Sequence, residues 1–435
     1  MRIGIWCDYG FTLEPSEGIG VFVDNLARGL VRADPDCQIV MMAHPGQEQA
    51  LESTAASGDG RIQVVSGLCY SRVRRKTIRS LKKIRRFLGE PTRQRPFRFW
   101  VDQTARHFLE KLTEKGVAEL SQIIDSCDMW LLPYVGLEQH FTKPTVVVIH
   151  DLVCYHFPEM MSEARLVALK QIVNRVTSEA TIAACMSSFI RDNDLIGTLN
   201  LPPSRVRVIK PAVPDDIACN SSEVAMPANT DWLEARGING PFLFYPAAFR
   251  TYKNHTALVQ CLQLLRRRSV THWKLVFTGI EKCPSILREQ IRTLGLSDDV
   301  IVLGKVSRTE LQRLYQQAFA TFVPSLYEQG SFPVMEALAN NCPVAASDIP
   351  SLREQFSCLG SDMLYFDPHE PESLVQVVEY IQQHRNDVIA GQHQGFQTLK
   401  DRTWEDAGRE WLSVFRESVL IGRRISNITK KSEIA

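Results

Sequence analysis

The sequence predicts an α/β fold with two domains. Short apolar runs alternate with stretches of helical periodicity from Arg2 onward, and the same alternation starts again at Pro241. Between these halves, residues 211–240 contain prolines and acids without periodicity, as a linker would. At 435 residues the chain is long enough for two separate cores.

The first half contains the strands that we expect for one parallel sheet. A continuous β-branched run, Thr145–Ile149, is typical of a strand buried on both faces of such a sheet. After the first strand, Val23, Leu26 and Leu30 recur at helical spacing, and a loop ending in Gly18 and Gly20 comes before them. The expected strands are Arg2–Asp8, Gln38–Ala43, Met129–Pro133, Thr145–Ile149, Thr181–Met186 and Arg205–Lys210.

The second half repeats the pattern and ends in helices. Helices are expected at His255–Arg267, from residue 306 onward, near Pro371–Ile381 and around Trp404–Val419. Ser331 is a hydroxyl-bearing capping candidate for a further helix, because Pro333 and an apolar face follow it. The expected strands are Pro241–Pro246, Lys274–Gly279, Val300–Gly304, Ala320–Val323 and Pro343–Ala346, with residues 364–368 extended after them.

Two glutamates flank the start of that helix. Glu328 lies in the preceding loop, and Glu336 lies about one turn, roughly 4.5 Å, beyond Pro333 along the helix. Carboxylates accept hydroxyl protons, and the unpaired amides of a helix start hold phosphate. The arrangement therefore suits a nucleotide sugar, whose hydroxyls lie at both ends of a diphosphate. From the spacing alone, a solvated helix is the alternative.

Composition narrows the class of protein. A content of 44% hydrophobic and 23% charged residues, with a formal net charge of +1, is typical of a globular chain. The eleven cysteines include no Cys-x-x-Cys pair, so we expect reduced core thiols instead of disulfides or a zinc site. Because the chain opens on an apolar strand and has no long apolar run, we expect a cytoplasmic location.

One segment is strongly basic. Residues 71–98 contain twelve Lys or Arg and one acid, Glu90. This segment lies in an insertion at about 70–120, where a narrow apolar stripe runs among the cations. It could contact an anionic membrane at its inner face or hold a polyanionic acceptor. A solvated helix packed by the stripe is the alternative. Nucleic-acid binding is disfavoured, because no binding module accompanies the charge.

The glutamate motif resembles a known family signature. Pro324–Ala339 (PSLYEQGSFPVMEALA), followed by Cys342–Ala345, closely resembles the signature of family 4 retaining glycosyltransferases. That resemblance implies the GT-B fold, in which two Rossmann-like domains face each other across a cleft. It covers residues 1–45, 125–215 and 240–420. We expect domains at 1–212 and 213–402, with residues 403–435 crossing back to the first domain as a helix and tail.

By this resemblance, the donor sugar and its nucleotide bind around the motif. Glu328 would contact the donor sugar, and Glu336 would bind the ribose hydroxyls. Gly330, Ser331 and Phe332 would form the donor-binding turn. In place of the family's usual glycine, residues 329–331 read Gln-Gly-Ser here.

The resemblance also assigns two cations. Lys253 matches the family lysine that stabilises the departing diphosphate, a charge that is often the largest catalytic contribution. The family arginine, five positions earlier, is Ala248 in this chain, and Arg250 is its substitute. Surface cations that only aid solubility are the alternative for both positions.

Residues of the first half complete the expected site. By the resemblance, His150 lies beside the reacting sugar, with Asp151 next to it at the carboxyl edge of the sheet. Gly18 and Gly20 would form the family's glycine-rich loop, although a simple turn is the alternative from sequence alone. A lone histidine at a strand end is otherwise more often structural.

The resulting hypothesis is a retaining glycosyltransferase. It would move a sugar from a nucleotide-diphosphate sugar to a saccharide or lipid-linked saccharide, as in cell-surface polysaccharide synthesis. Acceptor attack on the leaving-group face and a covalent intermediate both remain open. A sugar-nucleotide hydrolase or epimerase and a non-catalytic membrane- or polyanion-binding scaffold are the alternatives.

We expect no metal and no other cofactor. Two acid-x-acid strings, Asp34–Asp36 and Asp192–Asp194, could be mistaken for metal ligands. The first lies in a turn before a strand and the second in an expected helix, so we interpret both as structural. Fixed cations and a helix start can replace the metal in stabilising the leaving group.

Overall fold

A computed structural model gives the fold of residues 1–9, 11–13, 18–66, 118, 120–136, 139–219, 230–268, 270–279 and 282–434. The basic segment 71–98 and most of the insertion around it lie outside these described residues, so the expected membrane contact stays a prediction. The chain divides into two compact units. Residues 1–148, 172–184 and 408–435 form the first, and residues 149–171 and 185–407 form the second. The domain boundaries expected at 212 and 402 stay predictions.

The first sheet is parallel and has the strand order β3-β2-β1-β4-β5-β6-β7. Six of its strands fall where the sequence predicts them, and β3 is additional. Its strands are β1 (Arg2–Trp6), β2 (Gln38–Ala43), β3 (Ile62–Ser66), β4 (Met129–Leu132), β5 (Thr145–Val148), β6 (Ile182–Cys185) and β7 (Val206–Val208).

Close packing fixes the centre of this sheet. Gly4 of β1 lies opposite Trp130 of β4, and a Cβ built on Gly4 would lie 2.3 Å from the indole ring. Trp130 is fully buried, so glycine is required beside it. Helix α1 (Gly18–Ala33) connects β1 to β2, and η1 (Glu48–Leu51) and α2 (Glu52–Ala56) lie between β2 and β3.

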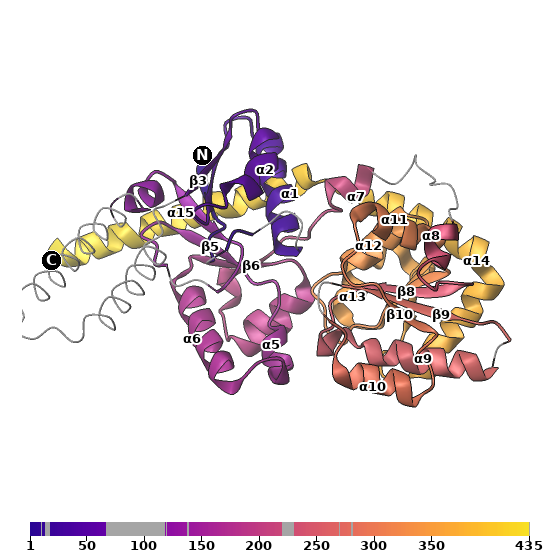
Figure 1. The fold of residues 1–435 in the computed structure, drawn as a ribbon. Helices are drawn as coiled ribbons and strands as arrows, with labels where there is room; N and C mark the ends of the chain where they lie inside the picture. The colour runs from indigo at the N-terminus through magenta and orange to yellow at the C-terminus, as the bar shows by residue number, and fades with distance from the viewer. Residues whose placement is uncertain are drawn as a thin grey trace, which may run out of the picture. The chain divides into compact units, whose positions relative to one another are not determined.

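The second sheet is also parallel, with the order β10-β9-β8-β11-β12-β13. Helices α9 and α10 cover one of its sides, and α11 and α12 lie on the other (Figure 1). The strands are β8 (Phe242–Pro246), β9 (Lys274–Thr278), β10 (Val300–Val302), β11 (Ala320–Val323), β12 (Val344–Ser347) and β13 (Leu364–Phe366).

The helices of the second sheet follow the same alternation. Each crossover contributes one helix, as a doubly wound sheet requires. They are α9 (His255–Arg268), α10 (Ser285–Thr293), α11 (Arg308–Gln317), α12 (Phe332–Ala339), α13 (Pro350–Gln355) and α14 (Pro371–Lys400), with η5 (Thr251–Lys253) and η6 (Ser357–Asp362).

Between the strands β5 and β8 the chain forms further helices and helical turns. The expected linker at 211–240 is not wholly irregular, because α7 and α8 lie within it. The elements are α5 (Val153–His156), η2 (Pro158–Met160), α6 (Glu163–Glu179), η3 (Ile190–Thr198), η4 (Pro203–Arg205), α7 (Asp215–Cys219) and α8 (Thr230–Glu234).

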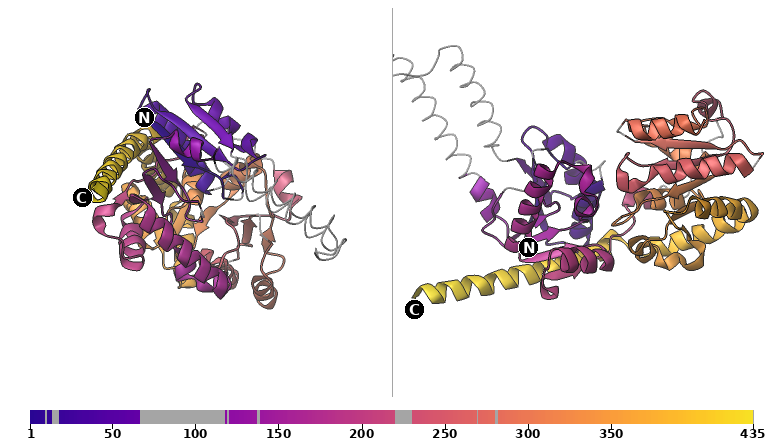
Figure 2. Two further views of the ribbon diagram at one scale, coloured as in Figure 1. Left: turned by 90° about the vertical axis from the view of Figure 1, so that its left-hand side faces the viewer. Right: turned by 90° about the horizontal axis from the view of Figure 1, so that it is seen from below.

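The last element, α15 (Trp404–Ile434), is one long helix (Figure 2). From Gly408 onward it belongs to the first unit. There Trp411 packs against Phe22 of α1, with ring centroids 5.9 Å apart. A Cβ on Gly408 would lie 2.6 Å from the carbonyl oxygen of Gly29, so glycine lets the two helices approach closely.

Candidate active site

The site forms where the strand order of the second sheet reverses. The chain enters at β8, runs to one edge through β9 and β10, and returns to the other side of β8 at β11. Loops after the two strands flanking such a reversal lie together at the carboxyl edge, where ligands bind. Lys253 follows β8 and Glu328 follows β11. The backbone amide of Leu326 donates to the carbonyl of Tyr252 at 2.7 Å and joins the two loops.

The buried Glu328 forms an ion pair with the half-buried Lys253. The Nζ of Lys253 donates to Oε1 of Glu328, and the Oγ of Ser325 donates to the same oxygen at 2.6 Å. Tyr245 contacts the Oγ of Ser325 at 3.1 Å, and Ser325 is fully buried. Glu328 itself is 7% exposed. Both described donors therefore hold Oε1, and the orientation of Oε2 follows from them. The sequence indicated neither Ser325 nor Tyr245.

The start of α12 is capped as the sequence predicts. The Oγ of Ser331 accepts from the amide of Val334, and Pro333 occupies one of the first two helical positions. The amide of Ser331, however, donates to Oε1 of Gln355 at 2.8 Å. The turn is therefore poorer in free amides than the sequence suggests. Pro333 has no N–H, and the amides of Ser331 and Val334 already donate to Gln355 and Ser331. The amide of Phe332 is therefore the one in this first turn that is left to bind a ligand.

Glu336 lies one turn into α12, as expected, and its carboxylate accepts a hydrogen bond from a neighbouring helix. The hydroxyl of Tyr315 on α11 donates to Oε2 of Glu336 at 2.7 Å. Burial raises the pKa of Glu336 above its usual value, while the bond from Tyr315 lowers it. Tyr315 is nearly fully buried and orients the carboxylate. Nothing in the sequence pointed to it, because it lies on another helix of the sheet.

His150 is brought to the glutamate loop. Its Nδ1 lies 3.1 Å from Oε1 of Gln329, the residue after Glu328. The neighbouring Asp151 accepts from the amide of Val153 at 3.1 Å. Burial raises the pKa of Asp151 to about 6, and the charge of Glu328 acts in the same direction. The histidine that sequence reasoning singled out thus shares one compact unit with Glu328.

Other predicted site residues are less closely placed. Arg250 is exposed at the start of η5, although its charge acts on the phenol of Tyr252. Gly18 and Gly20 form the first turn of α1 instead of ending the loop before it. That part of the prediction was wrong by one turn, because helix periodicity begins at the apolar residues and glycine gives no helix signal. Both glycines belong to the first unit.

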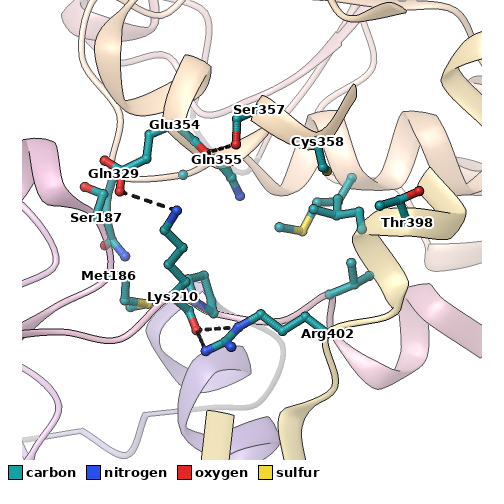
Figure 3. Close-up of a pocket in the computed structure, with 15 residues that line it drawn as sticks. Met186, Ser187, Lys210, Gln329, Glu354, Gln355, Ser357, Cys358, Thr398 and Arg402 are labelled. Atoms are coloured by element: carbon teal, nitrogen blue, oxygen red, sulfur yellow. Dashed lines mark hydrogen bonds and ion pairs between the residues drawn. The ribbon is translucent and has the colours of Figure 1, made fainter. Parts of the chain in front are cut away.

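A cavity of about 220 Å³ lies behind the glutamate loop (Figure 3). Gln329 and Gly330 line it, but Lys253, Glu328 and Glu336 do not. Lys210 extends toward Glu354 across the cavity, with 3.8 Å between the charged groups. The side chain of Gln355 packs under Gly330, where an added Cβ would lie 3.1 Å from its amide. The cavity therefore backs the loop instead of holding its carboxylates.

Carboxylates of both acid-x-acid strings accept hydrogen bonds from neighbouring groups of the protein. Asp34 accepts from the amide of Asp36 at 2.9 Å, and Asp192 pairs with the guanidinium of Arg191. Within the part of the chain that the structure describes, no cluster of three or more acidic, histidine or cysteine side chains could hold a metal ion. Among the helices described, none has the length and hydropathy that crossing a membrane requires.

Comparison with known sequences gives a consistent set of relatives. A family described as Glycosyl transferases group 1 matches residues 230–388. O-antigen chain mannosyltransferase B of Escherichia coli is 24% identical over 280 residues, which cover 64% of this chain and 71% of that protein. O-antigen chain mannosyltransferase RfbU of Salmonella typhimurium is 25% identical over 250 residues, 56% of this chain and 64% of that protein.

Solved structures show the same fold over the whole chain. The crystal structure of Anabaena Alr3699/HepE in complex with UDP and glucose has a TM-score of 0.60 at 14% identity, covering 99% of this chain and all of that one. A glycosyltransferase from Rickettsia africae ESF-5 has a TM-score of 0.61 at 14% identity, covering 96% and 98%. These likenesses confirm the predicted fold of two Rossmann-like, parallel-sheet domains.

Proposed function

We propose that this GT-B chain, whose residues 230–388 match the family described as Glycosyl transferases group 1, is a retaining glycosyltransferase. Its donor is a nucleotide-diphosphate sugar, and its acceptor is a saccharide or lipid-linked saccharide. The sequence-based recognition of a glycosyltransferase agrees with the family match and with both mannosyltransferase relatives.

One observation carries the proposal: the Lys253–Glu328 pair lies at the strand reversal, with Glu328 in the loop before α12, and Glu336 follows about one turn into that helix. A lysine ammonium has three N–H donors, and Glu328 takes one of them. The remaining donors can neutralise a departing diphosphate. Such preorganised charge stabilises the transition state more than it would in water, because the pair lies largely out of solvent.

The two carboxylates divide the donor between them. Ser325 and Lys253 hold Oε1 of Glu328, so Oε2 is the oxygen offered to a sugar hydroxyl. Tyr315 holds Oε2 of Glu336, which leaves Oε1 for a ribose hydroxyl. Gly330, Ser331 and Phe332 lie between the two glutamates in the chain, and the diphosphate would bind along this turn. Each carboxylate is therefore oriented by its own protein donors before the ligand binds.

His150 and Arg250 act at the reacting end. His150, held by Gln329, lies beside the anomeric carbon, and the acceptor attacks on the leaving-group face, which retains the configuration. Arg250 adds a second cation near the phosphates. Gly18 and Gly20 belong to the acceptor side, together with the first domain. No metal ion takes part, because Lys253 and Arg250 supply the positive charge.

The relatives suggest the donor sugar and the acceptor class. Both O-antigen relatives are mannosyltransferases, so a nucleotide-diphosphate mannose is the first donor to test. By the same comparison, the acceptor is a growing cell-surface polysaccharide or its lipid-linked precursor. Residues 71–98, with twelve cations, would bring the cytoplasmic face of an anionic membrane close to such an acceptor.

The test begins with ligand binding. Thermal unfolding is measured with UDP, GDP, ADP, dTDP and their sugars, first without metal and then with magnesium. A nucleotide at one hundred times its dissociation constant raises the stability by about 2.7 kcal/mol. We expect a shift with one base, lost in Glu336→Gln and kept in the control Glu379→Gln, which alters an exposed residue of α14.

Transfer is then measured with the donor that binds. Release of the nucleoside diphosphate should require an acceptor, and NMR of the product should show the anomeric configuration of the donor. Turnover without any acceptor would instead identify a hydrolase or epimerase. Transfer that EDTA abolishes and manganese restores would overturn metal independence. A folded protein that binds none of these nucleotides would refute the proposed function.

A further inference from the structure

Asp194, the second acid of the Asp192–Asp194 string, is a fully buried carboxylate that the proposed function does not use. It lies on η3, a π-helix, which is a rare element that often occurs at functional sites. Glycine is needed within this helix, because a Cβ on Gly197 would lie 2.9 Å from the carbonyl oxygen of Asp192. A buried charge is costly unless donors surround it. The hydrogen-bond partners of Asp194 therefore indicate which segments this helix connects.

Four donors surround the carboxylate. Its Oδ1 accepts from Nε2 of His156 at 2.9 Å and from Nδ2 of Asn193 at 2.8 Å. Its Oδ2 accepts from the amide of Leu152 at 2.9 Å and from the hydroxyl of Tyr327. An ionised carboxylate has about four acceptor positions, so all of them are used. This assignment places a proton on Nε2 of His156.

The two donors on Oδ2 come from the two loops of the candidate site. We call residues 150–152 the His150 loop and residues 325–331 the Glu328 loop. Leu152 ends the first, and Tyr327 immediately precedes Glu328 in the second. One oxygen atom of Asp194 therefore joins the backbone of the His150 loop to a side chain of the Glu328 loop.

Tyr327 has little freedom to leave this position. It is 7% exposed, and its ring packs against those of His156 and Phe189, with centroids 4.8 Å and 5.9 Å away. Burial raises the pKa of Tyr327 well above its usual value, and the charge of Asp194 raises it further. The phenol therefore stays protonated at neutral pH and donates its hydrogen to the carboxylate.

We propose that Asp194 is a positioning residue, which holds the His150 loop against the Glu328 loop so that His150 faces the donor sugar bound at Glu328. This inference rests on the proposed function. Asp194 itself touches no substrate in this role and acts through Leu152 and Tyr327. The contact of His150 with Gln329, at 3.1 Å, is the link that the cluster keeps in place.

The central experiment is Tyr327→Phe, with Tyr155→Phe as the matched control. Both changes delete one phenol oxygen, and the Tyr155 hydroxyl has no hydrogen-bond partner within the described chain. A misplacement of reacting groups by about 1 Å can lower a rate by roughly 100-fold. We expect kcat to fall by about 10- to 100-fold in Tyr327→Phe, with an unchanged dissociation constant for the nucleotide, whereas Tyr155→Phe keeps both values.

A double-mutant cycle separates positioning from a general loss of stability. Asp194→Asn weakens the same contact, so the double variant Asp194→Asn/Tyr327→Phe should be no slower than Asp194→Asn. Multiplicative losses of kcat would overturn the proposal. So would a Tyr327→Phe variant that is as active as Tyr155→Phe, or one whose nucleotide affinity falls as far as its kcat.

Hydrogen exchange without substrate tests the geometry independently of activity. Amides of the His150 loop should exchange faster in Tyr327→Phe than in wild type, although the mutation lies in the other loop. The control Tyr155→Phe should leave the Glu328 loop unchanged. If the wild type transfers no sugar but Tyr327→Phe still speeds exchange in the His150 loop, the proposed function is wrong and the link between the two loops is supported. If exchange in the His150 loop is unaffected, the cluster does not join the loops.

Discussion

Asp151 should cost the folded protein stability at neutral pH. The side chain lies next to His150 and accepts from the amide of Val153. Burial raises its pKa from 3.8 to about 6, and the nearby charges of Glu328 and Asp194 add to this, while the Val153 amide and Lys253 act in the opposite direction. The change to asparagine keeps the acceptor oxygen and removes the charge.

The sign and size follow from the two pKa values. Below pH 3.8 Asp151 is protonated in both the folded and the unfolded chain, so it costs nothing. Between pH 3.8 and about 6 the folded state binds more protons, and stability falls as the pH rises. Above pH 6 the cost is constant. A difference of roughly 2 pKa units corresponds to about 3 kcal/mol.

Urea unfolding of wild type and Asp151→Asn between pH 3.5 and 8 measures this cost. We expect equal stability at the acid end and a gain of about 3 kcal/mol for the variant at pH 7.5. The control Asp192→Asn alters an exposed carboxylate whose pKa is lowered by a hydrogen bond from Arg191. It should give no gain. A variant that is no more stable than wild type at pH 7.5 would refute the reasoning.

Three further changes test other parts of the structure. Lys253→Met leaves the buried carboxylate of Glu328 without its cation, so it should lower the free energy of unfolding by about 3 kcal/mol. The double variant Lys253→Met/Glu328→Gln should recover part of this loss. Equal urea midpoints for wild type and Lys253→Met would contradict the prediction. Burial lowers the pKa of His255 from 6.5 to about 3. The histidine therefore costs no stability above pH 6.5, and the free energy of unfolding falls as the pH drops from 6.5 toward 3, by about 5 kcal/mol in total. Unfolding of His255→Gln, measured over the same pH range, should lack this loss. Gly4→Ala forces a Cβ against the buried Trp130 and should cost about 1–3 kcal/mol, seen as a lower melting temperature; an unchanged melting temperature would contradict this.

Most of the strands could be predicted from the sequence, because strands inside a parallel sheet are buried on both faces and therefore appear as continuous apolar runs. The strand β3 was missed because only Ile62 of its five residues is buried, so its run carries polar residues. The short helices α7 and α8 were missed for a different reason. Each has five residues, too few for a helical period to show in the sequence.

The site was predictable where one segment carries it and not where distant segments meet. Glu328, Ser331 and Glu336 share a single motif, so their spacing was readable, and the cap on Val334 is confirmed. Tyr315 and Asp194 lie on other elements and reach the site only through the fold. Asp194 was noted as part of an acid-x-acid string, but nothing in the sequence indicated its contact with Tyr327.

The start of α12 shows how the fold shifts the chemistry from amides to a cation. The sequence suggested several free amides for a diphosphate, but Gln355 occupies that of Ser331, and Ser331 occupies that of Val334. With Pro333 lacking an N–H, the helix offers little beyond the amide of Phe332. In the function that we propose, a diphosphate at this edge is therefore neutralised mainly by side chains. Lys253 is the cation held there, and its pairing with Glu328 fixes its position before a ligand arrives, so that little reorganisation is needed when the leaving group becomes charged.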